Sequence, residues 1–424
     1  MAIQLVWRSV FAALTVFCAA EAGTLRCDKL LDVNSGKILS DQVITYDKAG
    51  VITSVAPAAG AQLPADTIVV SGRTCLPGLI DAHVHLTGDA TDQGYQALGV
   101  SIPAEAIRGV KNARITLLAG FTTARNVGAG GYSDVALRDA INDGGVIGPR
   151  LEVSGPMMSI TGGHGDNNLL PFEYHRSEDG VADGPWALRA KVREIVKYGA
   201  DLIKISASGG VLSKGDSPGA EQLTLEEMQA IVTEAHKLGR KVAAHAHGTQ
   251  AIRDAILAGV DSVEHSSLID AEGIKLSKEH GTYLVFDIYN DDYILAEGIK
   301  SGMLPESIEK EKKIGRLQRE NFKKAFLGGA KMAFGTDAGV YPHGDNAKQF
   351  AKMVEWGMKP IDAIRAATLN AADLMGWKDK VGALTPGHYA DVIAVSGNPL
   401  EDVTTLEHVS FVMKSGEVVK NEIR

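Results

Sequence analysis

Two histidine pairs close apolar stretches of the chain, and their spacing suits metal binding. His83 and His85 end the stretch GLIDAHVHLTG, and His245 and His247 end KVAAHAHG. Side chains two residues apart in an extended strand leave the same face, so each pair directs two imidazoles toward one point. Converging imidazoles are typical ligands of a divalent metal ion. The two pairs therefore predict a metal site.

A lysine inside another apolar run is the next candidate. Lys204 lies in LIKISASGG without an acidic residue close to it in the sequence. Burial disfavours an ammonium ion and lowers the pKa of a lysine toward that of a neutral amine. A neutral amine can react with CO2 to form a carbamate, which bridges two metal ions as a carboxylate does. The alternative is an ammonium that reaches solvent or pairs with a distant acid, and the residues alone leave both open.

Two further polar residues end apolar runs, His265 in SVEHSSL and Asp337 in MAFGTDAG. Each has an ordinary structural explanation, because strand-end histidines often only donate hydrogen bonds and an aspartate after a turn often caps a loop. Chance placement of all these residues at run ends is improbable. We therefore predict one shared site that contains His83, His85, Lys204, His245, His265 and Asp337.

Eight short apolar runs alternate with amphipathic segments, which is typical of βα units and a parallel sheet. Eight units within residues 78–383 predict an α/β fold, a (β/α)₈ TIM barrel, in which chemistry lies at the strand ends. An open doubly wound sheet fits less well, since no glycine-rich phosphate loop follows the first run. The predicted strands are 79–83, 121–126, 151–157, 202–207, 242–245, 262–265, 283–288 and 332–336, and predicted helices include 225–238, 250–258 and 317–327.

The two ends of the chain share a different pattern, in which apolar and polar residues alternate between short turns. Residues 23–77 and 384–424 are therefore predicted to form one small composite β-sandwich domain beside the barrel. This domain contains Cys27 and Cys75, which the sequence allows either to form a disulfide or to remain two buried thiols.

Residues 1–22 predict an exported protein. Arg8 precedes an apolar run that ends before a small-x-small cleavage pattern, as in a signal peptide removed on the way to the periplasm or the medium. The run is too short to span a bilayer as a membrane anchor. The formal net charge of −9, without a dense basic cluster, excludes a nucleic-acid partner.

The chain resembles the metal-dependent amidohydrolase superfamily, whose pattern is HxH on strand one, a carboxylated lysine on strand four, histidines on strands five and six, and an aspartate on strand eight. The resemblance covers nearly the whole chain. Within the superfamily the chain is similar to exported dipeptidases of the prolidase and imidazolonepropionase-related branch, and especially to bacterial amidohydrolases that cleave ochratoxin A. The stretches that carry this similarity are AGFTTARNVG, TGGHGD, KISASGGVLS, VAAHAHG, YNDDY and FGTDAG.

The resemblance implies two zinc ions, held by the six residues of the predicted site with Lys204 N-carboxylated by CO2. It makes Asp337 the residue that moves protons, and it makes His164 and His247 substrate contacts that support the reaction. Arg125 is a further candidate contact, although a salt bridge inside the barrel explains it equally well. Gly88 supplies no side chain beyond His85, which would leave room for a bulky acyl group.

The implied reaction is hydrolysis of the amide bond of a small molecule, an N-acyl amino acid or a dipeptide, with release of the C-terminal amino acid. Ochratoxin A, split to ochratoxin α and L-phenylalanine, belongs to this substrate class. The resemblance also implies a large homo-oligomer such as an octamer. Two rival hypotheses are a one-metal ring hydrolase or deaminase of the same superfamily, and an inactive metal-binding relative, against which the complete ligand set argues.

Overall fold

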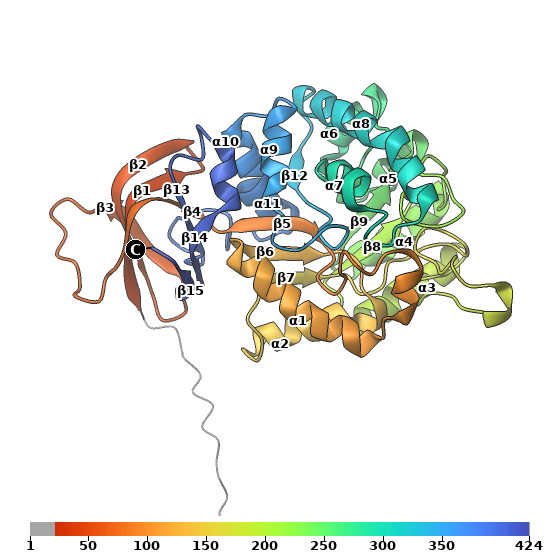
Figure 1. Cartoon of the computed structure of the whole chain (residues 1–424), viewed down its shortest axis with the longest axis horizontal. Helices are drawn as coiled ribbons and strands as arrows, with labels where there is room; N and C mark the ends of the chain where they lie inside the picture. The colour runs from red at the N-terminus through yellow and green to blue at the C-terminus, as the bar shows by residue number, and fades with distance from the viewer. Residues whose placement is uncertain (1–21, 424) are drawn as a thin grey trace, which may run out of the picture.

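The computed structural model describes residues 22–423, so the predicted signal peptide lies outside the described residues except for its last position. Figure 1 shows two parts side by side: a sheet that combines the N-terminal and C-terminal strands, and a larger body in which helices surround strands. Within the described part of the chain, no helix is long and apolar enough to cross a membrane.

Strands from both ends of the chain pair in one seven-stranded sheet, with the order β15-β14-β13-β4-β1-β2-β3. The N-terminal and C-terminal groups meet where β4 pairs with β13 in antiparallel register. All seven strands are joined by hydrogen bonds, so the predicted sandwich is not built from two separate sheets. The strands are β1 (Gly23–Asp32), β2 (Lys37–Tyr46), β3 (Ile52–Pro57), β4 (Ile68–Pro77), β13 (Val392–Ser396), β14 (Val409–Lys414) and β15 (Glu417–Asn421).

A disulfide joins Cys27 on β1 to Cys75 on β4, so the disulfide alternative is confirmed over two free thiols. Both cysteines are fully buried in a core that draws side chains from both ends of the chain, among them Leu25, Val70 and Phe411. The pairing of β1 with β4 is parallel, which the predicted succession of antiparallel strands did not include.

Eight parallel strands form the centre of the larger part, and each of the eight predicted strands has a counterpart. They lie in a three-stranded sheet, β5-β6-β7, and a five-stranded sheet, β12-β11-β10-β9-β8. Almost every residue of these strands is buried, as expected of parallel strands covered by helices. The strands are β5 (Leu79–Val84), β6 (Phe121–Asn126), β7 (Arg150–Val153), β8 (Leu202–Ser206), β9 (Lys241–Ala246), β10 (Ser262–His265), β11 (Tyr283–Phe286) and β12 (Met332–Phe334).

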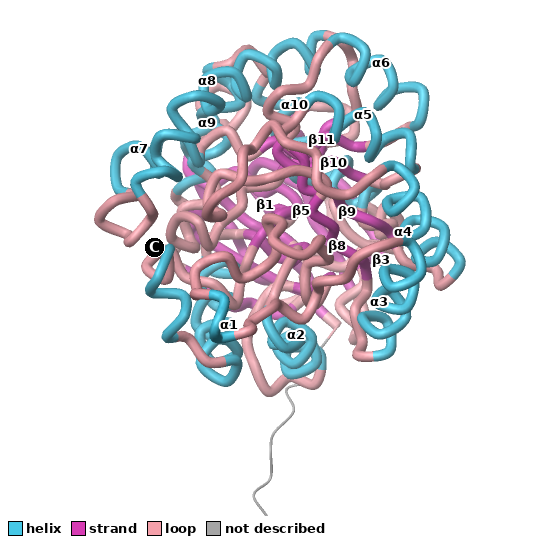
Figure 2. Tube along the Cα trace, turned by 90° about the vertical axis from the view of Figure 1, so that its right-hand side faces the viewer, coloured by secondary structure: helices cyan, strands magenta, loops and turns pink. Residues whose placement is uncertain are grey.

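Backbone hydrogen bonds join these two sheets at both of their edges. On one side, the His85 amide donates to the Ala338 carbonyl at 2.8 Å, next to a parallel bridge between Val84 and Ala338. On the other side, the Met158 amide donates to the Lys204 carbonyl at 2.8 Å. The helices surround the strands, as Figure 2 shows. The carboxyl ends of all eight strands therefore face one common region.

The helices begin and end at local sequence signals. Thr224 and Glu227 form a capping box at the start of α4, and Gly259, with a φ of 93°, ends α5. The helices are α1 (Ile102–Leu118), α2 (Ser133–Asn142), α3 (Pro185–Lys197), α4 (Leu225–Lys237), α5 (Thr249–Ala258), α6 (Ala271–His280), α7 (Asn290–Glu297), α8 (Pro305–Leu327), α9 (Lys348–Glu355), α10 (Pro360–Arg365) and α11 (Ala371–Leu374).

Helix α8 is longer than the sequence predicts. The expected helix started at Leu317, whereas α8 starts at Pro305. Proline suits the first turn of a helix, because the backbone N–H that it lacks would form no hydrogen bond within the helix at that position. The first half of α8 lacks the regular apolar pattern from which helices are predicted, because Glu311 occupies one of the buried positions on its inward face. This extra length carries α8 over the region where the parallel strands end.

Replacing both Cys27 and Cys75 with alanine is expected to lower the free energy of unfolding by about 4 kcal/mol. The bond closes a loop across a sequence separation of 48 residues, which restricts the unfolded chain. Urea denaturation followed by circular dichroism measures the change. Treating the wild-type protein with dithiothreitol is the matched control, and equal stability of all samples would contradict the prediction.

Candidate metal centre and active site

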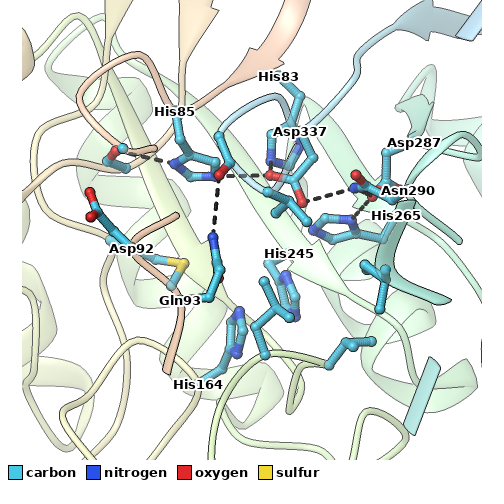
Figure 3. Close-up of a pocket in the computed structure, with 18 of the residues that line it drawn as sticks. His83, His85, Asp92, Gln93, His164, His245, His265, Asp287, Asn290 and Asp337 are labelled. Atoms are coloured by element: carbon cyan, nitrogen blue, oxygen red, sulfur yellow. Dashed lines mark hydrogen bonds and ion pairs between the residues drawn. The ribbon is translucent and has the colours of Figure 1, made fainter. Parts of the chain in front are cut away.

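One cavity of about 380 Å³ brings together nearly all of the predicted site residues (Figure 3). It opens at the carboxyl ends of the parallel strands, where the fold predicts that polar side chains meet. Arg125 is the predicted site residue that does not line it. The predicted residues that do are His83, His85, Gly88, His164, Lys204, His245, His247, His265 and Asp337.

The first group of possible metal ligands surrounds Asp337, which follows β12. Asp337 Oδ1 lies 3.4 Å from His83 Nε2 and 3.2 Å from His85 Nε2. Ligand atoms of His83, His265 and Asp337 all lie within 4.8 Å of one another. Figure 3 shows these side chains pointing toward each other from separate strands. They are near enough to share one ion.

A second group of possible metal ligands shares His265 with the first group. Ligand atoms of His245, His247 and His265 also lie within 4.8 Å of one another. Burial lowers the pKa of His245 and His247 well below the ordinary value, and nearby positive groups add to the effect. A neutral imidazole offers the lone pair that a metal ion requires, so these rings are prepared as ligands without first losing a proton.

Two of the proposed ligands have an unusual backbone conformation. His265 has a φ of 66° and Asp337 a φ of 58°, in the left-handed region that costs an ordinary residue on the order of 1–3 kcal/mol. In a regular strand, neighbouring side chains alternate between faces. The turn at His265 breaks this alternation, so His265 lines the cavity while Glu264, the residue before it, contacts His83. Such strain is typical of functional positions.

Lys204 on β8 is buried, with 1 % of its surface exposed, and it lines the cavity. Among residues 22–423 no carboxylate forms an ion pair with its Nζ, although Glu264 and Asp337 influence it from a distance. Burial lowers the pKa of Lys204 to about 8. The Lys204 side chain therefore faces the cavity and not the outer surface of the protein. An amine this close to neutrality is suited to carbamate formation.

Sequence reasoning missed Glu264, which holds His83 in place. Glu264 Oε2 accepts a hydrogen bond from His83 Nδ1 at 2.9 Å, and Oε1 accepts one from Arg125 Nη2 at 2.7 Å. The side chain is completely buried. Because Nδ1 of His83 is used in this way, its Nε2 is left for the cavity. The only signal in the sequence was a charged residue inside the apolar strand SVEH.

A second supporting group, also missed, comes from β11, α7 and α8. Asp287 Oδ2 lies 3.1 Å from His265 Nδ1, and Gln318 donates to Asp287 Oδ1 at 2.6 Å. Asn290 Nδ2 donates to Asp287 Oδ2 at 2.6 Å and to Asp337 Oδ2 at 3.2 Å. These contacts orient one ligand from each group. The stretch FDIYNDDY contains two of these three residues, but nothing in it indicates that their side chains point toward the site.

Arg125 lies apart from the cavity, in the interior between β5, β6 and β10. Its guanidinium donates to the Ala82 carbonyl at 2.6 Å, to Ser262 at 3.1 Å and to Glu264. Only 1 % of the side chain is exposed. The structure therefore matches the salt-bridge alternative, and a substrate contact by Arg125 is corrected to a contact that supports Glu264.

The other expected substrate contacts do line the cavity. The His164 ring stacks on the His245 ring with centroids 4.1 Å apart. His247 Nδ1 lies 2.7 Å from Ser267 Oγ, which orients that ring. At Gly88, a Cβ would meet only His85, at 3.4 Å from its carbonyl oxygen, so this part of the wall has space for a substrate group.

Helix α8 and the elements next to it give the cavity a mainly apolar wall that includes one carboxylic acid of α8, Glu311. Glu311, Ile314 and Gln318 lie on the inward face of α8, three and four residues apart, as one helix face requires. Burial raises the pKa of Glu311 to about 8, and Asp291 adds to the effect. Apolar side chains in this wall are Val211, Leu212, Ile294, Ile314 and Val340.

The donor set fits divalent metal ions. It combines neutral imidazoles, a carboxylate and a buried amine, all turned toward one cavity. Imidazole and carboxylate ligands in this combination suit zinc and similar ions. The side chains behind them, Glu264 and Asp287, are those expected to orient metal-binding histidines.

The chain belongs to the amidohydrolase family, because the model of that family matches residues 74–419. This superfamily consists of metal-dependent hydrolases, so the protein is a hydrolytic enzyme. Ochratoxinase from Aspergillus niger is 34% identical over 413 residues, which cover 91% of this chain and 83% of ochratoxinase.

Solved structures agree with this assignment. A Xaa-Pro dipeptidase with methionine bound in its active site is 38% identical, with a TM-score of 0.88, and the match covers 95% of this chain and 100% of the dipeptidase. The Aspergillus niger ochratoxinase structure is 32% identical, with a TM-score of 0.83, over 95% of this chain and 96% of the other. The chain is therefore similar to enzymes with both names.

Replacing Arg125 with methionine is expected to destabilise the protein by roughly 3–5 kcal/mol, because Glu264 would keep a buried charge without its partner. Bound metal should fall as well, since Glu264 orients His83. Chemical denaturation and metal analysis measure both effects. Arg316→Met is the matched control, since that exposed residue pairs only on the surface. A raised KM with unchanged stability would instead indicate a substrate contact.

Proposed function

We propose that this enzyme is a binuclear zinc amidohydrolase that cleaves the amide bond of N-acyl amino acids or dipeptides and releases the C-terminal amino acid. Ochratoxin A is a candidate substrate. The observation that carries the proposal is the single cavity into which His83, His85, Lys204, His245, His265 and Asp337 all project. Similarity to ochratoxinase and to a Xaa-Pro dipeptidase supports the substrate class.

The proposal includes the fold that positions these residues. We infer that the two parallel sheets are parts of one closed (β/α)₈ barrel over residues 78–383. The hydrogen bonds between the sheets at both edges support this closure. Residues 23–77 with 384–424 would form the accompanying domain, in keeping with their shared sheet.

In the proposed centre, His83 and His85 would hold one ion and His245 and His265 the other, with Asp337 beside the first pair. A carboxylated Lys204 would supply a further ligand from the same cavity. When bound, the metal ions lower the pKa of a water molecule and polarise the substrate carbonyl. The buried Lys204 amine, whose pKa burial lowers, supports carboxylation, because no acid among residues 22–423 forms an ion pair with an ammonium at this position.

The protein side chains supply proton transfer and orientation. The Asp337 carboxylate, held at Oδ2 by Asn290, takes a proton from the attacking water as oxygen bonds to the amide carbon. It then passes this proton to the nitrogen as the C–N bond breaks, which yields a carboxylic acid and an amine. His247 is the proposed hydrogen-bond donor to the developing oxyanion or to the substrate carboxylate.

The wall formed by α7, α8 and the loops after β8 and β12 suits an apolar substrate group. Val211, Ile294, Ile314 and Val340 give it a mainly hydrocarbon surface. Gly88 leaves space next to His85. Arg125 is not available for the substrate carboxylate, which leaves His247 as the proposed partner.

We further propose that the protein is exported to the periplasm or the medium after removal of residues 1–22, and that it works as a homo-oligomer. The buried disulfide between Cys27 and Cys75 supports export, since such bonds persist in oxidising compartments. Light scattering on the purified mature chain measures the assembly state.

The substrate class is tested with zinc-loaded enzyme and a panel of N-acyl amino acids, dipeptides and ochratoxin A. We expect release of the C-terminal amino acid, with faster turnover of amides whose side chains are apolar. Chelation should abolish turnover, and added zinc should restore it. No turnover of any member by metal-loaded protein would refute the proposal.

Replacing Lys204 with alanine is expected to leave fewer than two metal ions bound per chain and to reduce kcat by at least about 100-fold. The reason is that the variant cannot form the proposed carbamate ligand. Added short carboxylic acids should restore part of the activity by taking the place of the carbamate. Metal analysis and kinetics measure both effects. Full activity and unchanged metal content would favour the one-metal ring hydrolase or deaminase.

A further inference from the structure

The His164 ring is held in one orientation from three sides. Its Nδ1 lies 2.8 Å from Ser213 Oγ, and its face stacks on His245. Gly210 lies against the same ring, so closely that a Cβ at this position would lie 2.1 Å from His164 Nδ1. Any side chain at residue 210 would displace the imidazole. These contacts fix the plane of the imidazole ring.

Ser213 links His164 to a buried ion pair outside the cavity. Ser213 Oγ lies 2.7 Å from Asp216 Oδ1, which also accepts from Lys310 Nζ at 2.7 Å. Asp216 Oδ2 accepts from Gln222 Nε2 at 3.1 Å and from the Gly210 amide at 3.2 Å. The Asp216 and Lys310 side chains are only 10 % and 11 % exposed. The proposed centre uses neither residue.

Lys310 ties this arrangement to α8. Besides Asp216, its Nζ donates to the Gly210 carbonyl at 3.1 Å and to the Ser213 carbonyl at 2.6 Å. All three hydrogens of the ammonium are therefore used within the protein. The loop after β8 is thereby attached to the same helix that supplies the apolar wall of the cavity.

The number of available protons fixes the direction of these hydrogen bonds. Asp216 is paired with Lys310, so its carboxylate only accepts, and the single hydroxyl proton of Ser213 goes to it. The lone pair of Ser213 Oγ then faces His164, and Nδ1 must be the donor. If Nδ1 lacked a proton, two lone pairs would face each other at 2.7 or 2.8 Å.

We propose that Ser213 and Asp216 are positioning residues that keep the His164 proton on Nδ1, so that the neutral ring presents Nε2 to the substrate as a hydrogen-bond acceptor. The matching substrate group is a donor, and the N–H of a secondary amide is the one nearest the reacting bond. An acceptor does not stabilise an oxyanion, so that role belongs to other groups. The substrate part of this inference rests on the proposed amide hydrolysis.

The tautomer is tested without turnover by long-range proton–nitrogen NMR on the metal-loaded enzyme with ¹⁵N-labelled histidine. A His164→Gln variant identifies the signals of this ring. We expect the wild-type spectrum to show the proton on Nδ1, and Ser213→Ala to shift the ring toward the other tautomer, whereas Ser213→Thr keeps it. A wild-type ring protonated only on Nε2, or a ring unchanged in Ser213→Ala, would overturn the proposal.

Ser410→Ala is the control for these spectra, because Ser410 makes its hydrogen bonds in the terminal sheet. It should leave the His164 signals unchanged. The wild-type spectrum is decisive by itself, so the inference stays testable even if Ser213→Ala folds poorly. Because no substrate is present, a failure of the proposed amide hydrolysis would leave this result unaffected.

The substrate part is tested by comparing an N-acyl amino acid with its N-methylated analogue, which lacks the amide N–H. Loss of one such hydrogen bond corresponds to a fall in kcat/KM of roughly 10-fold. We expect Ser213→Ala to cause this fall for the secondary amide and to leave the low rate on the N-methylated amide nearly unchanged. An equal fall on both substrates would refute the acceptor role while leaving the tautomer result intact.

Discussion

The Glu264 carboxylate is the interaction on which the geometry of this site depends. It lies on β10 with no exposed surface, and it binds His83 from β5 and Arg125 from β6. A carboxylate in such surroundings is stable only with partners on both oxygens, and each partner is held in return. The contact therefore links three strands and directs His83 Nε2 to the cavity. It also explains why a fully buried arginine is present in the interior.

A similar dependence connects the outer part of the cavity to the proposed metal ligands. Helix α8 places Gln318 against Asp287, Ile314 in the apolar wall, and Lys310 against the loop that carries Ser213. One helix thus sets the position of Asp287, of the apolar wall and of the loop that contacts His164. A shift of α8 would move all three together, because a helix transmits displacement along its axis with little bending.

The sequence predicts the features that arise from local order. Apolar runs mark the eight strands. Polar residues at run ends indicate His83, His265 and Asp337, because parallel strands all end at one edge, and a lysine inside an apolar run indicates Lys204. What it could not predict depends on partners far apart in the chain. Glu264 and His83 are separated by 181 positions, and no local pattern indicates that they meet. The first half of α8 was missed because a polar residue, Glu311, occupies its buried face. The sequence allowed Arg125 to be either a substrate contact or a partner in a buried salt bridge. Only the positions of its hydrogen-bond acceptors distinguish the two.

The sheet shared by the two ends of the chain has a consequence for the order in which this protein folds. Strand β4 needs β13 along one edge, and more than 300 residues separate these strands. Leu25 and Val70 share their core with Phe411 and Met413, so this core cannot assemble while the chain is still being synthesised. The terminal sheet closes only when the last strands have been delivered. A chain shortened at its C-terminus would leave the edge of β4 and its apolar neighbours uncovered, which gives proteases a direct way to recognise incomplete molecules.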